Sequence, residues 1–164
     1  MVGLKAVVVA FAALVSSAAM SAPSPEGVPS PRELPYNASA NARADIAAAL
    51  ARASSEGKAV LLTFGANWCP DCRVLGAAMT TPPLADAISA RFVVVDIDVG
   101  NWDKNLDVVA AWGNPIANGI PSIVVADGHG TVLYATKAGE LANARRMGND
   151  AFVKFFTGLP TAVQ

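Results

Sequence analysis

The chain has 164 residues, of which 53% are hydrophobic, so it is long and apolar enough to form one compact domain with a substantial core. Lys and Arg together number 12 and Asp and Glu number 13, which gives a formal net charge of −1. This balance lacks the basic excess of a protein that binds nucleic acid, and no nucleic-acid partner is expected.

The first 21 residues have the pattern of a secretory signal peptide. Lys5 supplies the positive charge, an apolar run extends from Ala6 to about Val15, and small residues follow up to Ser21. The apolar run ends too soon for a spanning helix, which needs roughly 20 apolar residues. Cleavage after Ala19 or Ser21 would release the mature chain into the periplasm, where disulfides persist unless something reduces them. An uncleaved N-terminal anchor is the alternative.

Residues 22–38 are expected to form a Pro-rich linker. Five prolines between positions 23 and 35 prevent a continuous helix or sheet ladder. A spacer or a wrap around the domain is favoured over a Pro-rich ligand for another protein, because no further motif accompanies the prolines. The compact domain is then expected over residues 39–164.

The first half of this domain begins with a helix and a strand. A helix rich in Ala and Leu is predicted over residues 42–55, with Asn41 or Ser39 as its N-cap and Gly57 at its end. Residues 59–64, AVLLTF, form a short apolar run that is typical of a buried strand.

Helices and a second strand follow. One helix is predicted from Pro70 to Met79, and a short one begins at the Pro82-Pro83 pair with Thr81 as its cap. Residues 91–99 are predicted to form a second buried strand, and residues 103–112 are predicted to form a helix.

The last part of the chain predicts a hairpin and a closing helix. Two strands, within 121–127 and 131–136, flank the turn sequence DGHG, and a helix begins at a capping Asn149 and ends at Gly158. Helices that alternate with buried strands indicate an α/β domain with a mixed central β-sheet flanked by α-helices.

The chain has only two cysteines, Cys69 and Cys72, in the stretch NWCPDCR between a strand and a helix. The unpaired N–H groups and the dipole at a helix N-terminus stabilise a thiolate. Because the thiolate is the nucleophile in disulfide exchange, Cys69 is expected to attack and Cys72 to resolve the mixed disulfide. Trp68 adds an apolar flank that can contact a substrate chain.

Two structural roles for the cysteines are less favoured than redox chemistry. A structural disulfide across two intervening residues would constrain little, because the stabilisation grows with loop length. A structural zinc needs four ligands, and the chain offers two cysteines and the single His129, which is expected to be a solvated turn residue.

The motif WCPDC, followed about 50 residues later by Ile120-Pro121 just before a strand, resembles the thioredoxin family. The similarity covers about residues 40–158. It implies a thioredoxin fold, no metal, and a redox-active disulfide between Cys69 and Cys72 in place of a cofactor. It also implies that Pro121 is a cis-proline lying against the cysteines and that Ile120 offers backbone groups to an extended substrate strand.

The chain departs from well-known thioredoxins at one buried position. Those proteins carry an Asp six residues before the first cysteine, where this chain has Thr63, and the partner Lys falls near Val94 or Val95. The acid is thought to help deprotonate the resolving cysteine. Here the proton of Cys72 must leave through water, the Thr63 hydroxyl or another group.

The residues around the first cysteine are expected to tune the pair. Pro70 and Asp71 complete the motif, and Asp71, placed on the helix surface, is expected to act through its charge. An anion close to Cys69 opposes its thiolate, which favours a reducing pair, and Arg73 partly offsets this effect. Potentials in this fold range from about −270 mV for thioredoxin to about −120 mV for a strong oxidant.

The stretch before Pro121 is longer than its thioredoxin counterpart. Its VGxWDxN signature, with the later GE and ANAR, is similar to those of exported bacterial thioredoxin-like proteins. Trp102 in this loop is expected either to shape substrate choice or to pack the loop itself, whereas Trp112 is expected in the core. Arg145 and Arg146 are expected in a solvated turn.

The function predicted from these features is a periplasmic thiol–disulfide oxidoreductase that reduces protein disulfides through a Cys69 mixed disulfide resolved by Cys72. A membrane or periplasmic thiol–disulfide donor must supply its electrons, and a monomer is expected. The alternatives are a disulfide oxidase or isomerase, and a non-catalytic binding or metallochaperone module of the same fold.

Overall fold

A computed structural model describes residues 34–161 of the chain, and all that follows concerns this part. The expected signal peptide and most of the expected linker lie outside it. No helix in residues 34–161 is long and apolar enough to cross a membrane.

The centre of the domain is a four-stranded mixed sheet in the order β2-β1-β3-β4. Strand β1 (Ala59–Gly65) runs parallel to β2 (Phe92–Asp98) and antiparallel to β3 (Ser122–Ala126), which pairs in turn with the antiparallel β4 (Val132–Ala135). All seven residues of β1 are buried, since it lies between two strands and is covered on both faces. The predicted α/β class with a mixed sheet is confirmed.

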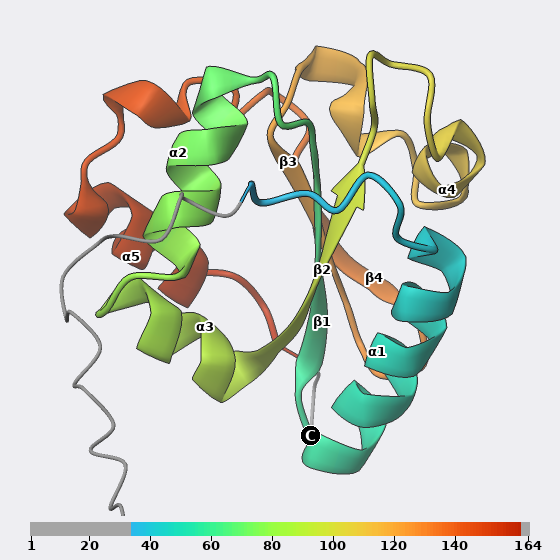
Figure 1. Cartoon of the computed structure of the whole chain (residues 1–164). Coiled ribbons are helices and arrows are strands. Elements are labelled where there is room, and N and C mark those ends of the chain that lie inside the picture. The colour runs from blue at the N-terminus through green and yellow to red at the C-terminus, as the bar shows by residue number, and fades with distance from the viewer. Residues whose placement is uncertain (1–33, 162–164) are drawn as a thin grey trace, which may run out of the picture. The chain divides into compact units, whose positions relative to one another are not determined.

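Helices cover both faces of the sheet, which Figure 1 shows edge-on. Helices α1 (Ala42–Glu56) and α4 (Leu106–Ala111) lie on one side, and α2 (Pro70–Met79), α3 (Leu84–Arg91) and α5 (Asn149–Thr157) lie on the other. Two short 3-10 helices, η1 (Pro115–Asn118) and η2 (Ala144–Arg146), complete the connections. The element order is the predicted one.

Local chemistry explains several of the helix ends. The Asn41 side chain accepts a hydrogen bond from the Ala44 N–H, and Gly57 ends α1 with a φ of 64°, a left-handed conformation that favours glycine. The predicted cap at Thr81 is wrong, because its hydroxyl donates to the Ala77 carbonyl at the end of α2 instead. The predicted cap at Asn149 is also wrong by one position, since Gly148 is the N-cap of α5.

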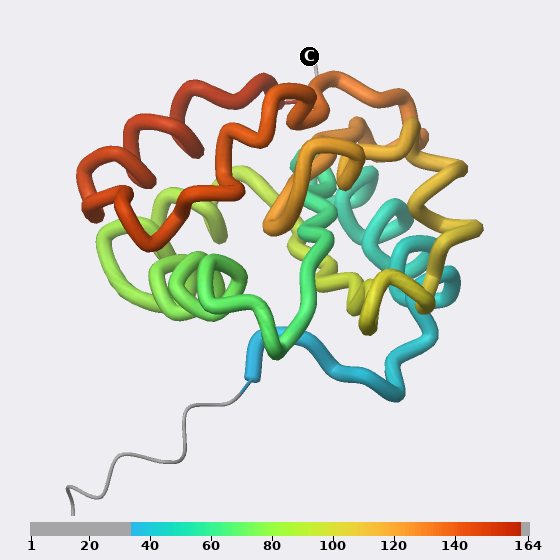
Figure 2. The backbone as a smooth tube through the Cα atoms, turned by 90° about the horizontal axis from the view of Figure 1, so that it is seen from above, coloured from blue at the N-terminus to red at the C-terminus, as the bar shows by residue number. Residues whose placement is uncertain are grey.

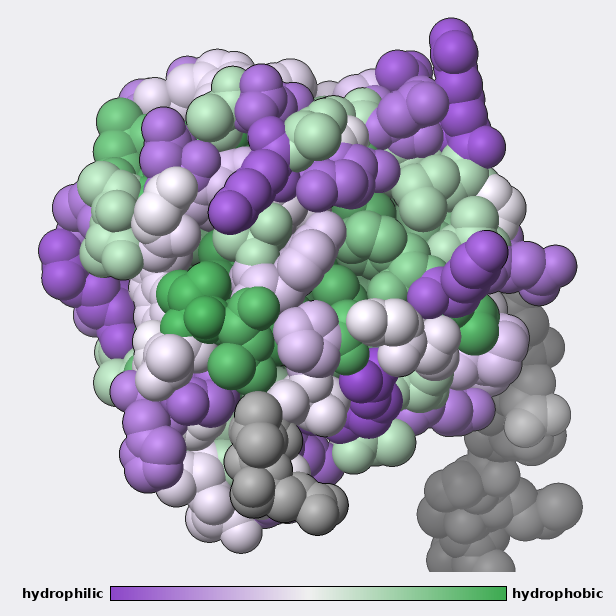
Figure 3. Space-filling view, turned by 180° about the vertical axis from the view of Figure 1, so that it is seen from behind, coloured by the Kyte–Doolittle hydropathy of each residue, from purple (hydrophilic) through white to green (hydrophobic). Residues whose placement is uncertain are grey.

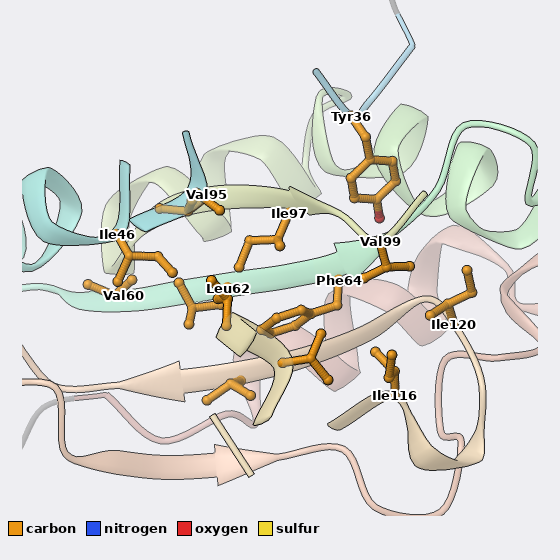
Figure 4. Packing of buried hydrophobic residues seen from close by; sticks show 14 of the residues in the cluster. Tyr36, Ile46, Val60, Leu62, Phe64, Val95, Ile97, Val99, Ile116 and Ile120 are labelled. Carbon is orange, nitrogen blue, oxygen red and sulfur yellow. The ribbon is translucent and has the colours of Figure 1, made fainter. Parts of the chain in front are cut away.

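Buried hydrophobic residues form one cluster on each side of the sheet. Figure 4 shows the cluster on the α1 side, where Leu62 and Phe64 of β1 meet Ile97 of β2 and side chains from the loops at the end of the sheet. In the second cluster, side chains of β1 and β3 pack against side chains of α3 and α5. Phe152 and Phe156 of α5 are each 1% exposed. Seen from behind, the surface mixes hydrophilic and apolar residues, with the apolar ones in small separate areas (Figure 3).

The last residues of the expected linker are part of the packed domain. Tyr36 is 4% exposed, and the Asn67 side chain both accepts from its N–H (3.1 Å) and donates to its carbonyl (2.7 Å). Pro35 lies against Gly76 of α2, where an added Cβ would come within 2.6 Å of it. Figure 2 shows this N-terminal segment passing beside the loop between β1 and α2. The domain therefore begins before residue 39.

Candidate active site

Cys69 lies where the chain leaves the sheet and enters α2. It is the N-cap residue of this helix, with Pro70 as the first helical residue, and its Sγ accepts a hydrogen bond from the Cys72 N–H at 3.3 Å. The helix N-terminus thus directs a backbone N–H group and the positive end of its dipole at the sulfur. This is an arrangement that favours a nucleophilic thiolate.

Ile120 and Pro121 lie against this sulfur from another part of the chain. The Cys69 thiol lies 3.7 Å from the Ile120 carbonyl oxygen, to which it donates, and the Ile120-Pro121 peptide bond is cis. Both residues are buried. The two segments that the sequence singled out, 51 residues apart, therefore meet at one place.

Cys72 is the more deeply buried of the two free cysteines, with an exposed fraction of 0% against 4% for Cys69. Burial, followed by the hydrogen bond to Cys69, raises the pKa of the Cys72 thiol far above its ordinary value. Cys72 is therefore a protonated thiol at neutral pH and must lose this proton before it can act as a nucleophile.

Two tryptophans form the exposed rim beside the cysteines. Trp68 and Trp102 are 50% and 45% exposed, with ring centroids 6.2 Å apart and planes inclined by 59°. The Trp68 indole N–H donates to the Gly100 carbonyl at 2.7 Å, which ties the motif to the loop that carries Trp102. Trp112, by contrast, is partly buried against the core cluster on the α1 side.

Asp71 does not lie on the helix surface as expected. It is 7% exposed, and its carboxylate accepts from the Arg145 backbone N–H (2.8 Å) and forms an ion pair with the Arg145 Nε (3.1 Å). Arg73 is exposed on α2. The charge that balances Asp71 therefore comes from Arg145, and Arg145 is not simply a solvated turn residue.

Thr63 has a carboxylate partner on the neighbouring strand. Thr63 of β1 stands directly opposite Asp96 of β2, and its hydroxyl donates to the Asp96 carboxylate. Although Asp96 is exposed at the edge of the sheet, the partial burial of its carboxyl group raises the pKa of Asp96, and the bond from Thr63 acts in the opposite direction. Sequence reasoning missed this acid, because it depends on the register of two strands.

Tyr36 is the second residue near the cysteines that sequence reasoning missed. Its ring enters the core with the hydroxyl directed toward the end of the sheet (Figure 4). A Cβ added to Gly65 would stand 2.3 Å from this hydroxyl oxygen and 2.9 Å from the Cys72 sulfur, so the phenol and the thiol share the space above Gly65. Burial, with the nearby Cys72 and Asp96, raises the pKa of Tyr36.

Residues 34–161 contain no group of three or more His, Cys, Asp or Glu side chains that could hold a metal ion. His129 is exposed in the turn between β3 and β4, as its position in the sequence suggests.

Comparison with known proteins agrees with the site. A family model described as thioredoxin-like matches residues 41–128. A solved structure described as a disulphide isomerase from Xylella fastidiosa Temecula1 is 46% identical, with a TM-score of 0.74, and the match covers 75% of this chain and 94% of that one.

The C-terminal domain of Neisseria meningitidis DsbD, in its oxidised form, is similar in fold. Its TM-score is 0.52 at 22% identity, over 74% of this chain and 97% of that domain. A search of curated proteins gave no match.

Proposed function

This chain belongs to the thioredoxin-like family, and on this basis we propose that it is a thiol–disulfide oxidoreductase that reduces protein disulfides in the periplasm. The observation that carries the proposal is the position of Cys69. Its sulfur caps the N-terminus of α2, next to the Ile120 carbonyl and within reach of Cys72. An attacking thiol needs this combination of thiolate stabilisation and an adjacent resolving thiol.

The reaction takes place in two exchange steps. The Cys69 thiolate attacks one sulfur of a substrate disulfide, and the other substrate sulfur leaves as a thiolate that takes up a proton. Cys72 then loses its proton and attacks the Cys69 sulfur, which releases the second substrate thiol. The substrate gains two electrons, the Cys69–Cys72 pair becomes a disulfide, and a separate thiol donor must reduce this disulfide again.

The substrate would lie along the rim beside Cys69. Trp68 and Trp102 offer apolar surface there, and the Ile120 backbone lies next to the sulfur. An extended protein segment can pair with such a backbone while its side chains contact the indoles. Protein disulfides are therefore the proposed substrates.

The burial of Cys72 supports the reducing direction. Strong oxidants of this fold are strong because their reduced form is stabilised. A thiol whose ionised form is disfavoured by burial gives no such extra stabilisation, which supports a pair towards the reducing end of the range.

Disulfide isomerisation is the second candidate, and the 46%-identical structure described as a disulphide isomerase favours it. An isomerase must release its substrate from the mixed disulfide without net reduction, which requires a potential that is less reducing. A potential close to about −180 mV, that of protein disulfide isomerase, would favour this candidate over a reductase near about −270 mV.

Residues 1–21 support export to the periplasm as part of the proposal. In a cell of a bacterium with two membranes, the chain is expected in the periplasmic fraction, shortened by cleavage after Ala19 or Ser21. Mass spectrometry of that fraction tests this part separately, and an uncleaved chain in the cytosol would contradict it.

The chemistry is tested by trapping. The variant Cys72→Ser is expected to accumulate covalent complexes with periplasmic proteins that dithiothreitol releases, because the mixed disulfide at Cys69 can no longer be resolved. The variant Cys69→Ser is the matched control and is expected to trap none. Equal trapping by both variants, or partners that stay bound under full reduction, would contradict the proposal and favour a binding module.

A further inference from the structure

Three side chains connect the buried Cys72 thiol with the edge of the sheet. The thiol is 0% exposed, so water cannot take its proton directly. The Tyr36 hydroxyl shares the space above Gly65 with the Cys72 sulfur, and the Thr63 side chain lies close to the Tyr36 hydroxyl. Thr63 bonds in turn to Asp96, which is exposed on the edge strand β2.

The one hydrogen bond formed in this series, from Thr63 to Asp96, sets the direction in which the other groups can donate. The Thr63 hydroxyl has a single proton and donates it to the Asp96 carboxylate. In this state the Thr63 oxygen can accept a hydrogen bond from Tyr36 but cannot donate one to it, and the Tyr36 oxygen has lone pairs that could accept from the Cys72 S–H group. Each hydroxyl can thus donate towards Asp96 and accept from the side of Cys72.

We propose that Tyr36, Thr63 and Asp96 form the route by which Cys72 loses its proton when it resolves the mixed disulfide. The inference rests on the proposed function. Tyr36 lies beside the reacting thiol, whereas Thr63 and Asp96 act through it as positioning residues.

Protons and electrons balance along this route. The Cys72 proton passes to the Tyr36 oxygen while the Tyr36 proton passes to Thr63 and the Thr63 proton passes to the Asp96 carboxylate. The Cys72 thiolate then forms the bond to the Cys69 sulfur, and the bond between Cys69 and the substrate sulfur breaks. The substrate leaves as a thiolate that water protonates, and Asp96 releases its proton to solvent at the sheet edge.

The other charged groups near Cys72 are engaged elsewhere. Asp71 of α2 pairs with Arg145, and Asp98 of β2 pairs with Lys104 at 3.4 Å. Cys69, the remaining titratable neighbour, is the group under attack. Among the described residues, Asp96 forms no ion pair, so no cation holds its charge and it is free to take up a proton.

The partial burial of its carboxyl group makes Asp96 a better proton acceptor than an ordinary carboxylate, because it raises the pKa of this group. The sign of the pH dependence follows from this. Asp96 accepts a proton only when ionised, so resolution should slow as the pH falls through its raised pKa.

Reaction of the full reduced chain with an aromatic disulfide, 5,5′-dithiobis(2-nitrobenzoate), separates the two steps. Attack by Cys69 releases one coloured thiolate, and attack by Cys72 on the resulting mixed disulfide releases the second. Stopped-flow absorbance therefore reports two phases, and only the second depends on deprotonation of Cys72.

The variants Asp96→Asn and Tyr36→Phe are expected to slow the second phase by about tenfold or more and to leave the first phase unchanged. Asp96→Asn should also lose the fall in rate on acidification. The matched controls are Asp86→Asn, an exposed acid on α3, and Tyr134→Phe, the only other tyrosine of the chain. Both controls should retain wild-type rates in both phases.

A second phase with the wild-type rate and pH profile in Asp96→Asn would overturn the inference. This variant changes an exposed edge position and should fold even if Tyr36→Phe does not, which circular dichroism checks. Absence of the first phase in the wild-type chain would instead overturn the proposed function, so the two failures can be distinguished.

Discussion

The buried thiol of Cys72 makes the stability of the reduced protein depend on pH. In the unfolded chain this thiol ionises near its ordinary value of 9.0, whereas burial raises the pKa of the folded thiol. A group with a raised folded-state pKa contributes stability that is fully present below the unfolded value and is lost as the pH rises towards the folded value. The reduced protein should therefore lose stability above about pH 9.

Urea unfolding of the reduced chain between about pH 7 and pH 10 tests this, with an expected loss of at most about 1.4 kcal/mol per pH unit from this group. Reduced Cys72→Ser lacks the thiol and should show a smaller decline over the same range. Tyr36, whose pKa is also raised, adds to the loss only at higher pH. Identical slopes for the two chains would show that Cys72 ionises equally well folded and unfolded.

The residues of the site differ in how far sequence could reveal them. Cys69 and Cys72 are adjacent in one motif, and Ile120-Pro121 stands before a recognisable strand, so pattern alone identified them. Asp96 could not be found this way, because its pairing with Thr63 depends on the register between β1 and β2. Tyr36 contacts residues about 30 positions later, and a tyrosine next to Pro35 carries no signal of burial.

Among the elements, α2 is held to the segment before α5 through one side chain. Asp71 in the first turn of α2 binds both the backbone and the side chain of Arg145 in η2. Asp71 thus fixes the position of the helix whose N-terminus carries Cys69. The ion pair also weakens the influence of the Asp71 charge on the neighbouring sulfur.

Removal of the arginine side chain should make the pair more reducing. In Arg145→Ala the Asp71 carboxylate loses its counter-charge and opposes a thiolate at Cys69, so the potential should become more negative by up to about 20 mV. The size follows from an ion-pair energy of about 0.2–1 kcal/mol, as is typical of a partly exposed pair, and from a shift of about 30 mV in reduction potential for each ~1.4 kcal/mol. The matched control is Arg146→Ala, which alters an exposed neighbour.

A redox titration of both variants measures this effect. No shift in Arg145→Ala, or an equal shift in Arg146→Ala, would mean that the Asp71 charge does not act on the cysteines.

The limits of most helices and strands followed from local pattern, and the exceptions have local causes. Asn41 has the side-chain oxygen that an N-cap requires, and Gly57 has the conformational freedom that the left-handed end of α1 requires. Thr81 was misplaced because its hydroxyl can serve either the helix that ends or the helix that begins, and the structure uses it at the end of α2. Helix α4 is shorter than predicted mainly at its start, because Asn105 has a φ of 52°, a left-handed conformation that cannot continue an α-helix.

Across the domain as a unit, the N-terminal segment closes one side of the active site. Tyr36 packs in the core cluster that also contains Cys69 and Cys72, and Asn67 binds its backbone. The proline content of this region indicates an extended path but cannot show that the path ends on the domain.

A chain that starts at residue 39 should therefore be less stable than one that starts at residue 22. Loss of a buried aromatic side chain costs about 3–5 kcal/mol in comparable cases. Urea unfolding of the two chains, with a third that starts at residue 34 and keeps Tyr36 as the control, measures the difference. If the chains that start at residues 22 and 39 are equally stable, Tyr36 does not take part in the cooperative unfolding of the domain.

A redox titration of the Cys69–Cys72 couple in the purified wild-type chain is the sharpest test of the proposed reductase. A periplasmic disulfide reductase predicts a reversible two-electron transition with a midpoint near about −270 mV. A midpoint near about −120 mV, or the absence of a two-electron transition between the two cysteines, would contradict this function.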